Sequence, residues 1–249
     1  MTKIRSAGTD YFVKLPLVIL FLSSALLVTE AQAQDGWQFA PYLRVDGGIS
    51  NTVDNNGTII DGGANIYTID VLPHTGGRVQ AGFGAKLSEF LRTDVTLSYR
   101  DNLASTDTVT LASGTVFPTS LGNHNTSNTT TLLNVYVDPF AVFGMDTGAF
   151  SPYVQGGIGW ARNTTKNMKF SSATIDGATH DNFAWQIGAG LNYTLSDHWK
   201  IDLSYRYLDM GQARGSKDFI NGVTPATLKQ ETRFDLQSHE VMFGLQYQF

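Results

Sequence analysis

One stretch decides the fold: Val241-Met242-Phe243-Gly244-Leu245-Gln246-Tyr247-Gln248-Phe249. Large apolar side chains alternate in it with small or polar ones, and the apolar set is Val241, Phe243, Leu245, Tyr247 and Phe249. Because successive side chains of a β-strand point to opposite faces, one face of such a strand is apolar and aromatic. A soluble core could bury that face. The same pattern is required of the strand that closes a transmembrane β-barrel and turns its apolar face toward lipid.

Seven upstream segments show the same alternation over about ten residues, which is the length that a tilted transmembrane strand requires. They are residues 42–50, 78–87, 93–101, 130–143, 153–162, 183–194 and 199–208. Segment 130–143 carries Pro139 on its apolar side. Proline is unfavourable inside a central strand, so the pattern leaves the end of this segment open. Together with 241–249, the segments predict eight strands.

The connections between these segments alternate in length. Four are long and rich in Asn, Thr, Ser and Gly, and are predicted to be solvated loops: 51–77, 102–129, 163–182 and 209–237. The other three are turns, of which the middle one, at about 144–151, is the longest. Bacterial outer-membrane barrels place short turns in the periplasm and long loops outside the cell. The sequence therefore predicts an all-β protein, an eight-stranded antiparallel up-and-down transmembrane β-barrel.

Two observations weigh against a soluble barrel, which would carry its apolar side chains inside. The faces opposite to the apolar ones carry charges and glycines instead of core residues. Large aromatic residues also lie near the segment ends, as in an interfacial girdle: Tyr42, Tyr99, Trp160, Phe183, Trp185, Trp199, Tyr207 and Phe249. We therefore expect the apolar faces to point toward lipid.

The first 33 residues have the features of a secretory signal peptide. Lys3, Arg5 and Lys14 form a basic region, residues 15–28 are mostly apolar, and Ala31-Gln32-Ala33 fits a cleavage site. The apolar run is too short to cross about 30 Å of hydrocarbon as a helix. We expect residues 1–33 to be removed after Sec export, and residues 34–249 to form the barrel domain.

Composition excludes several functional classes. The chain has no cysteine, which excludes disulfides, thiolate metal sites and cysteine catalysis. Lys and Arg number 17 against 22 Asp and Glu, so there is no basic surface for nucleic acid. The five histidines lie mostly in loops or turns, with no pair at metal-ligand spacing. We expect no metal and no cofactor.

Charged residues occupy inward positions of several segments and would share one lumen. They are Arg44, Asp46, Arg78, Lys86, Asp94, Arg100, Asp202, Arg206 and Glu240. An eight-stranded barrel is only wide enough for side chains to fill it, and buried charges must be paired. We predict a structural ion-pair network that fills the lumen, with a proton- or ion-conducting path as the alternative. Glycines such as those of Gly156-Gly157-Ile158-Gly159 are expected to leave room in this crowded interior.

Enzyme signals are few. Ser238-His239-Glu240 places three residue types of a catalytic triad side by side. Adjacent residues of a strand point to opposite faces, so contiguity cannot build a relay from them. We predict no catalytic residue and no enzymatic activity, with a lipid-modifying outer-membrane enzyme as an alternative.

Three stretches resemble the small OmpA-like/opacity-type outer-membrane β-barrel family of Gram-negative bacteria. They are 183–191 (FAWQIGAGL), 202–209 (DLSYRYLD) and 238–249 (SHEVMFGLQYQF), and 151–159 (SPYVQGGIG) fits as well. The resemblance implies an eight-stranded barrel, insertion from the periplasm by the barrel-assembly machinery through the C-terminal strand, and surface-exposed loops. Members are surface antigens, adhesins and envelope-integrity proteins, often labelled porins, and they share no catalytic residues.

Residues and resemblance together predict an integral outer-membrane protein with a structural and surface-interaction role. The alternatives are a narrow porin-like channel for ions or small solutes, and the lipid-modifying enzyme. The expected partners are outer-membrane lipid and lipopolysaccharide, the assembly machinery, and host or phage ligands of the four loops. We expect no nucleic acid partner and a monomer, because an eight-stranded barrel closes on itself without a partner strand.

Overall fold

The computed structural model describes residues 39–53, 55–60, 66–73, 75–101, 104–111, 116–118, 126–170, 173–221, 224–227 and 233–249. The predicted signal peptide, residues 1–33, lies outside these residues.

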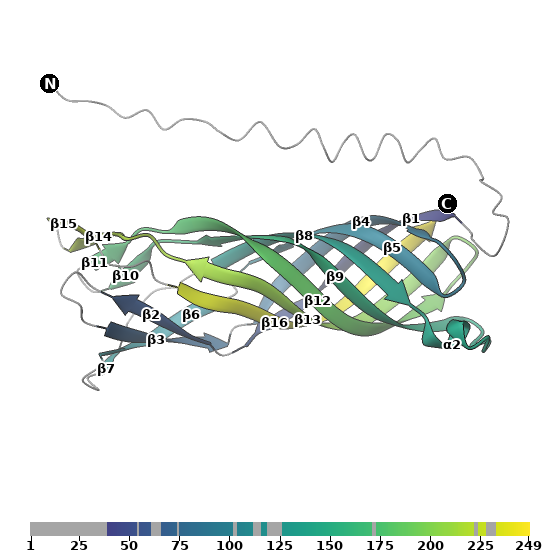
Figure 1. Ribbon diagram of the computed structural model, residues 1–249, viewed down its shortest axis with the longest axis horizontal. Coiled ribbons are helices and arrows are strands. Elements are labelled where there is room, and N and C mark those ends of the chain that lie inside the picture. The colour runs from purple at the N-terminus through teal and green to yellow at the C-terminus, as the bar shows by residue number, and fades with distance from the viewer. Residues whose placement is uncertain are drawn as a thin grey trace, which may run out of the picture.

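Eight long strands form a closed antiparallel barrel (Figure 1). They are β1 (Ala40–Thr52), β4 (Thr75–Lys86), β5 (Leu91–Arg100), β8 (Thr126–Val137), β9 (Phe150–Thr165), β12 (Ala178–Thr194), β13 (Trp199–Arg214) and β16 (Arg233–Gln248). Each pairs with the next in this order, and β16 pairs back with β1, with Val45 opposite Leu245. The predicted up-and-down barrel is confirmed, and the stretch 241–249 belongs to the strand that closes it.

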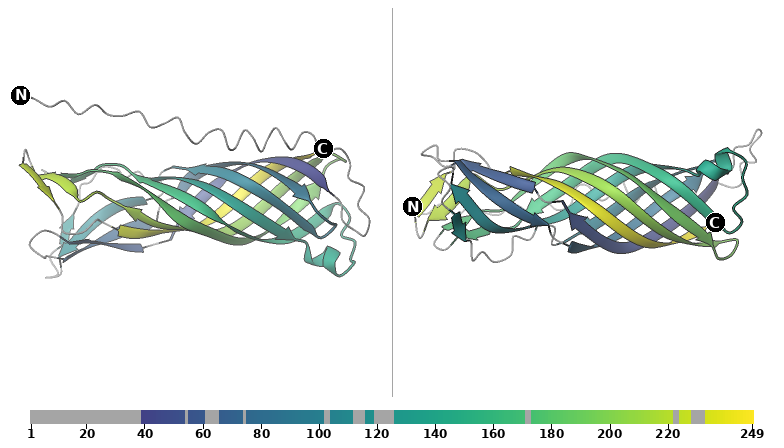
Figure 2. Two further views of the ribbon diagram at one scale, coloured as in Figure 1. Left: turned by 45° about the horizontal axis from the view of Figure 1, so that its top comes forward. Right: turned by 90° about the horizontal axis from the view of Figure 1, so that it is seen from below.

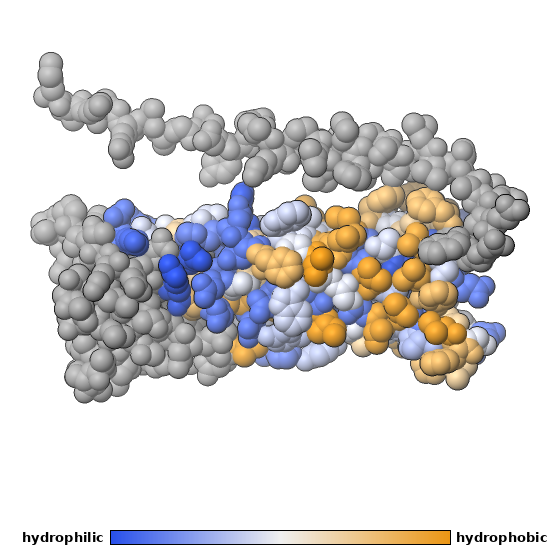
Figure 3. Space-filling model, viewed as in Figure 1, coloured by the Kyte–Doolittle hydropathy of each residue, from blue (hydrophilic) through white to orange (hydrophobic). Residues whose placement is uncertain are grey.

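The two faces of the barrel wall have opposite chemistry. On β16, Val241, Phe243 and Leu245 are exposed on the outside, whereas Met242 and Gln246 are buried inside. Apolar side chains gather in a belt over the half of the molecule that holds the C-terminus (Figure 3). Large exposed apolar surfaces of this kind are covered by another phase, here lipid. Among the described residues, no helix is both long and apolar enough to traverse a bilayer.

The four long connections were predicted to be solvated loops, but they contain further strands, so the prediction of loop structure is wrong there. The added strands are β2 (Asn55–Ile60), β3 (Ile66–Pro73), β6 (Ala104–Leu111), β7 (Val116–Pro118), β10 (Met168–Phe170), β11 (Ala173–Ile175), β14 (Asp218–Asn221) and β15 (Thr224–Thr227). They pair as β2-β3-β6-β7 and as β10-β11-β14-β15, at the end of the barrel opposite the C-terminus (Figures 1 and 2). We name these two groups the strand extensions. Threonine, which made the loops look polar, is itself favourable in strands.

The fourth predicted segment, 130–143, ends earlier than expected. Strand β8 stops at Val137, and a short helix, α2 (Pro139–Val142), follows it. Asp138 caps this helix, since its Oδ1 accepts hydrogen bonds from the backbone N–H groups of Phe140 (2.9 Å) and Ala141 (3.1 Å). Proline lacks an N–H and is favoured in the first turn of a helix, so Pro139 ends the strand and begins α2.

Candidate functional site: the lumen and the two ends of the barrel

The lumen contains two layers of charge, and Arg44 is the centre of the one nearer the periplasm. Its Nη2 lies 2.6 Å from Asp46 Oδ1 and 3.1 Å from Asp202 Oδ1, and its Nη1 lies 3.6 Å from Asp94 Oδ2. These residues come from β1, β5 and β13, and none is more than 2% exposed. The strands bring three carboxylates to one guanidinium, and we call this group the lower layer.

Tyrosine hydroxyls offset the excess of carboxylates in the lower layer. Tyr42 and Tyr136 each donate to Asp94 over 3.1 Å, and Tyr153 donates to Asp202 over 2.6 Å. A buried carboxylate needs such donors to be tolerated. The prediction that Tyr42 belongs to the outer girdle is wrong. Tyr42 shares the inward face of β1 with Arg44, because the two are separated by two positions.

Arg92 completes the lower layer, although it was not predicted. Its guanidinium lies over the rings of Tyr136 and Tyr153, at 4.3 and 4.5 Å from their centroids, and its Nη1 donates to Gln246 Oε1 over 2.9 Å. A guanidinium stacked on aromatic faces is stabilised by cation–π attraction. The sequence contained a sign of this position, because Arg92 lies two residues before Asp94 and therefore faces the same side of the strand. It was missed because the predicted strand began at residue 93.

The second layer, the upper layer, lies on the extracellular side of the first and has more cations than anions. Glu240 pairs with Arg78 and with Arg100, whose Nε lies 2.6 Å from Glu240 Oε1. Arg206 donates to Gln80 Oε1 over 3.2 Å. Gln80 also donates to Asp46 over 2.8 Å, so it joins the two layers. Eight of the nine predicted lumen charges therefore lie in the two layers.

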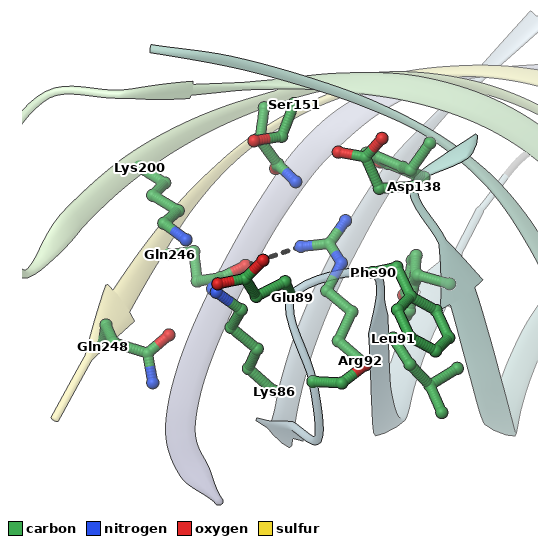
Figure 4. Close-up of a pocket in the computed structure, with 14 residues that line it drawn as sticks. Lys86, Glu89, Phe90, Leu91, Arg92, Asp138, Ser151, Lys200, Gln246 and Gln248 are labelled. Atoms are coloured by element: carbon green, nitrogen blue, oxygen red, sulfur yellow. Dashed lines mark hydrogen bonds between the residues drawn. The ribbon is translucent and has the colours of Figure 1, made fainter. Parts of the chain in front are cut away.

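The ninth, Lys86, lies apart from the layers, at the periplasmic mouth. It is half-buried and has no carboxylate within 4 Å among the described residues. It lines a cavity of about 70 Å³ together with Arg92, Lys200, Glu89 and Gln246 (Figure 4). Lys86 is the last residue of β4, and the lumen opens at that point.

Apolar side chains occupy the lumen beyond the upper layer, beside the buried amides of Asn128 and Asn163. They are Leu208, Met210, Ala213, Phe234 and Leu236, all buried, on the parts of β13 and β16 that lead away from the periplasm. We call this group the apolar cap. It was not predicted. The inward positions of these strands are otherwise polar, and a few apolar residues among them do not mark a separate face in the sequence.

The barrel wall separates the three triad-type residues. Ser238 and Glu240 are fully buried inside, whereas His239 is exposed outside and its Nδ1 lies 2.7 Å from the hydroxyl of Tyr205. Ser238 and His239 therefore cannot exchange a proton directly. In the part of the chain that the structure describes, no three His, Cys, Asp or Glu side chains are grouped to hold a metal ion.

Aromatic residues mark both edges of the apolar belt. Trp160, Phe183 and Trp185 are exposed at the extracellular edge. At the periplasmic edge, the rings of Trp199 and Tyr247 lie 4.9 Å apart. Two such girdles are typical of the two interfaces of a membrane.

Comparison with known proteins agrees with this geometry. Residues 19–249 match the family model described as outer membrane protein beta-barrel domain. The chain is 33% identical to the outer membrane protein PagN of Salmonella typhimurium over 125 residues, which are 49% of each chain, so the match spans about half of that relative. It is 28% identical to a putative adhesin of Rickettsia bellii, over 91% of this chain and 93% of that one.

Among solved structures, Neisserial surface protein A superposes with a TM-score of 0.51, covering 84% of this chain and 97% of that one at 12% identity, which is a likeness of fold. The chain therefore belongs to the outer membrane protein beta-barrel family, and it is a protein of the Gram-negative outer membrane.

Proposed function

We propose that the protein is a closed outer-membrane barrel with a structural role, which presents its strand extensions to ligands at the cell surface. The observation that carries this proposal is the filled lumen. Buried side chains of the two charged layers and the apolar cap occupy it from the periplasmic cavity to the extracellular half. An eight-stranded barrel has no width to spare once such side chains fill it.

The same filling argues against the alternative of a narrow porin-like channel. An ion that enters the periplasmic cavity meets Arg44 and Arg92, then the arginines of the upper layer, and then the apolar cap packed beside buried asparagine and threonine side chains. Apolar constrictions exclude water and therefore ions. We infer that the lumen charges hold the barrel together as an ion-pair network and do not conduct.

The extracellular end of the barrel, which carries the strand extensions, supports a surface role. Strands β9, β12, β13 and β16 continue beyond the extracellular aromatic girdle, and their backbone pairing extends to Ala178–Thr165 and Arg214–Arg233. The barrel thus carries a hydrogen-bonded platform for the surface segments. The name of the Rickettsia relative, a putative adhesin, agrees with such a role. We propose host or phage surfaces as ligands, and outer-membrane lipid and lipopolysaccharide as the surroundings.

We also propose that the protein is not an enzyme. The separation of His239 from Ser238 and Glu240 by the barrel wall supports this. The proposal includes removal of residues 1–33 after Sec export, insertion by the barrel-assembly machinery through β16, and a monomeric state, since every strand of the closed barrel already has two partners.

Two measurements test the function. The protein is refolded in detergent, its folding is checked by heat-modifiable gel mobility, and its conductance is then recorded in planar bilayers. We expect folded protein without steady channels, and reproducible channels would replace our proposal with the pore. In the second measurement, bacteria display the protein on their surface, and their binding to host cells is measured. One variant replaces residues 104–118 by a short Asn-Gly turn, and a second replaces 168–175 in the same way.

Binding should fall in at least one of these variants, or in a variant that replaces 55–73 or 218–227, while gel mobility stays that of a folded barrel. Binding that survives replacement of both segments, and of 55–73 and 218–227 as well, would contradict the surface role.

A further inference from the structure

One periplasmic turn is longer than the closure of its hairpin requires. Residues 138–149 connect β8 to β9, whereas residues 87–90 connect β4 to β5 and residues 195–198 connect β12 to β13. Hairpin loops need only about two to five residues. The longer turn therefore has a further reason, and its side chains indicate which.

The long turn exposes four large apolar side chains. Phe140, Val142 and Met145 are exposed, and Phe143 is 74% exposed, the highest value of any large apolar residue that the structure describes. The turn contains no lysine or arginine. Monomeric proteins in water rarely present such a cluster without a partner surface.

The turn has a defined shape, so this exposure is built into the fold. Helix α2 is capped by Asp138, and the backbone N–H of Met145 donates to Phe140 O over 2.9 Å. Asp146 Oδ1 accepts from the N–H of Gly148 over 2.8 Å. Both carboxylates of the turn thus bond to its own backbone, and the apolar side chains are left to face outward.

The apolar surface of the turn is continuous with the lipid-facing belt. Phe150, the first residue of β9, is exposed on the outside of the barrel, and its ring lies 4.9 Å from that of Tyr193. The N–H of Asp138 donates to Phe90 O over 2.9 Å, and Phe90 is exposed as well. Figures 1 and 2 show α2 at the rim of the barrel, projecting beside the wall at the end that holds the C-terminus.

We propose that residues 138–149 form a membrane foot, which lies in the periplasmic leaflet of the outer membrane at the boundary between head groups and acyl chains. Lipid fits better than a protein partner, because lipid already covers the adjoining belt and the turn has no lysine or arginine, while its two carboxylates bond to its own backbone. Short amphipathic segments bind bilayer interfaces by burying apolar side chains in this way. The foot would fix the depth and tilt of the barrel, together with the aromatic girdles.

The absence of cysteine makes the test direct, since any introduced cysteine is the only one in the chain. Phe143→Cys is labelled with a nitroxide in refolded protein in phospholipid vesicles, and its accessibility to oxygen and to a water-soluble nickel chelate is measured. Val45→Cys reports the lipid-facing belt, and Asp197→Cys reports the short, polar turn after β12. Met145→Cys repeats the measurement if Phe143→Cys fails to fold.

We expect the ratio of oxygen to nickel accessibility at position 143 to exceed that at position 197 severalfold and to stay below that at position 45, which lies deeper in the bilayer. A ratio equal to that at position 197 would place the turn in water and overturn the proposal. Shielding from nickel that disappears as the lipid-to-protein ratio rises would assign the surface to a second copy of the chain instead, and would overturn it as well.

A substitution gives an independent measurement. Phe140→Ser combined with Phe143→Ser should leave gel mobility unchanged but increase the mean tilt of the barrel, as measured by polarised infrared spectroscopy of oriented bilayers. Asp197→Ser, in the short turn, is the matched control and should leave the tilt as it is. An unchanged tilt in the double variant would show that the turn does not anchor the barrel.

Discussion

Arg100 and Glu240 are 140 positions apart in the sequence, yet Arg100 Nε donates to Glu240 Oε1 over 2.6 Å inside the barrel. Arg78 reaches the same carboxylate from β4. Glu240 therefore pairs with two of the arginines of the upper layer. Because it lies near the middle of the closing strand, these two pairs form only when the barrel closes.

Glu240→Gln should be strongly destabilising. It keeps the size of the side chain but removes the charge that compensates Arg78 and Arg100, and loss of one partner of a buried ion pair costs about 3–5 kcal/mol. The free energy of unfolding is measured by urea titration in lipid vesicles, with tryptophan fluorescence as the signal. Arg162→Gln is the control, because the Arg162–Asp181 pair is exposed, at 53% and 58% of the side chains, and should contribute about 1 kcal/mol or less. Equal effects of the two substitutions would contradict a structural role of the upper layer.

Arg44 should show the same kind of dependence on its partners. Arg44→Met leaves Asp46, Asp94 and Asp202 without their shared cation, and should destabilise the barrel by several kcal/mol, of the order of 3–5 kcal/mol for a broken buried pair. Adding Asp46→Asn to this variant should restore part of the stability, because one uncompensated carboxylate is then neutral. Strict additivity of the two substitutions in unfolding titrations would show that Arg44 and Asp46 do not interact.

Gly159→Ala should destabilise the barrel through overpacking. A Cβ atom at Gly159 would lie 2.0 Å from the backbone oxygen of Thr131, and a backbone atom cannot move aside as a side chain can. Overpacking of this kind costs about 1–3 kcal/mol. Gly47→Ala is the control, because nothing lies within 4 Å of a Cβ there. The midpoint of thermal unfolding, read from the heat-modifiable gel shift, should fall for Gly159→Ala and stay constant for Gly47→Ala.

The position of the membrane can be tested by charge insertion. Val45 lies well inside the apolar belt, so Val45→Arg should reduce stability in vesicles by about 2–4 kcal/mol, the cost of an arginine on the lipid face near the midplane. Asn51, exposed near the extracellular end of β1, should tolerate arginine at a cost of about 1 kcal/mol or less. A reversed order of the two costs would show that the belt does not span the bilayer.

Alternation along the segments, together with the alternating lengths of the connections, predicted the barrel. The alternation identified the eight strands, assigned the apolar faces to lipid and Arg44 and Asp46 to the lumen, and indicated Glu240 as an inward charge. These properties are local, because the direction of a strand side chain depends only on its parity. Tyr42 and Arg92 lie at the ends of their segments, and both follow the same rule: each faces the lumen because it is two positions from an inward charge.

Other features depend on the tertiary structure. The pairing of Arg100 with Glu240, and of Arg44 with three carboxylates, follows from the register in which β16 closes on β1 and from the tilt of the strands, and residues far apart in the chain meet only after closure. The strand extensions form because a neighbouring strand supplies their hydrogen bonds. The apolar cap likewise requires β13 and β16 to pair, with a register shift between Asp209 and Gln212 on β13.

The sequence by itself determined which side of the wall most residues face and how often the chain crosses the membrane, because both follow from a period of two along each strand. Only the tertiary structure decided which charges pair, where the lumen is closed, and where the long periplasmic turn exposes its apolar side chains. Those properties depend on distances between segments, and a periodicity within one segment carries no information about them.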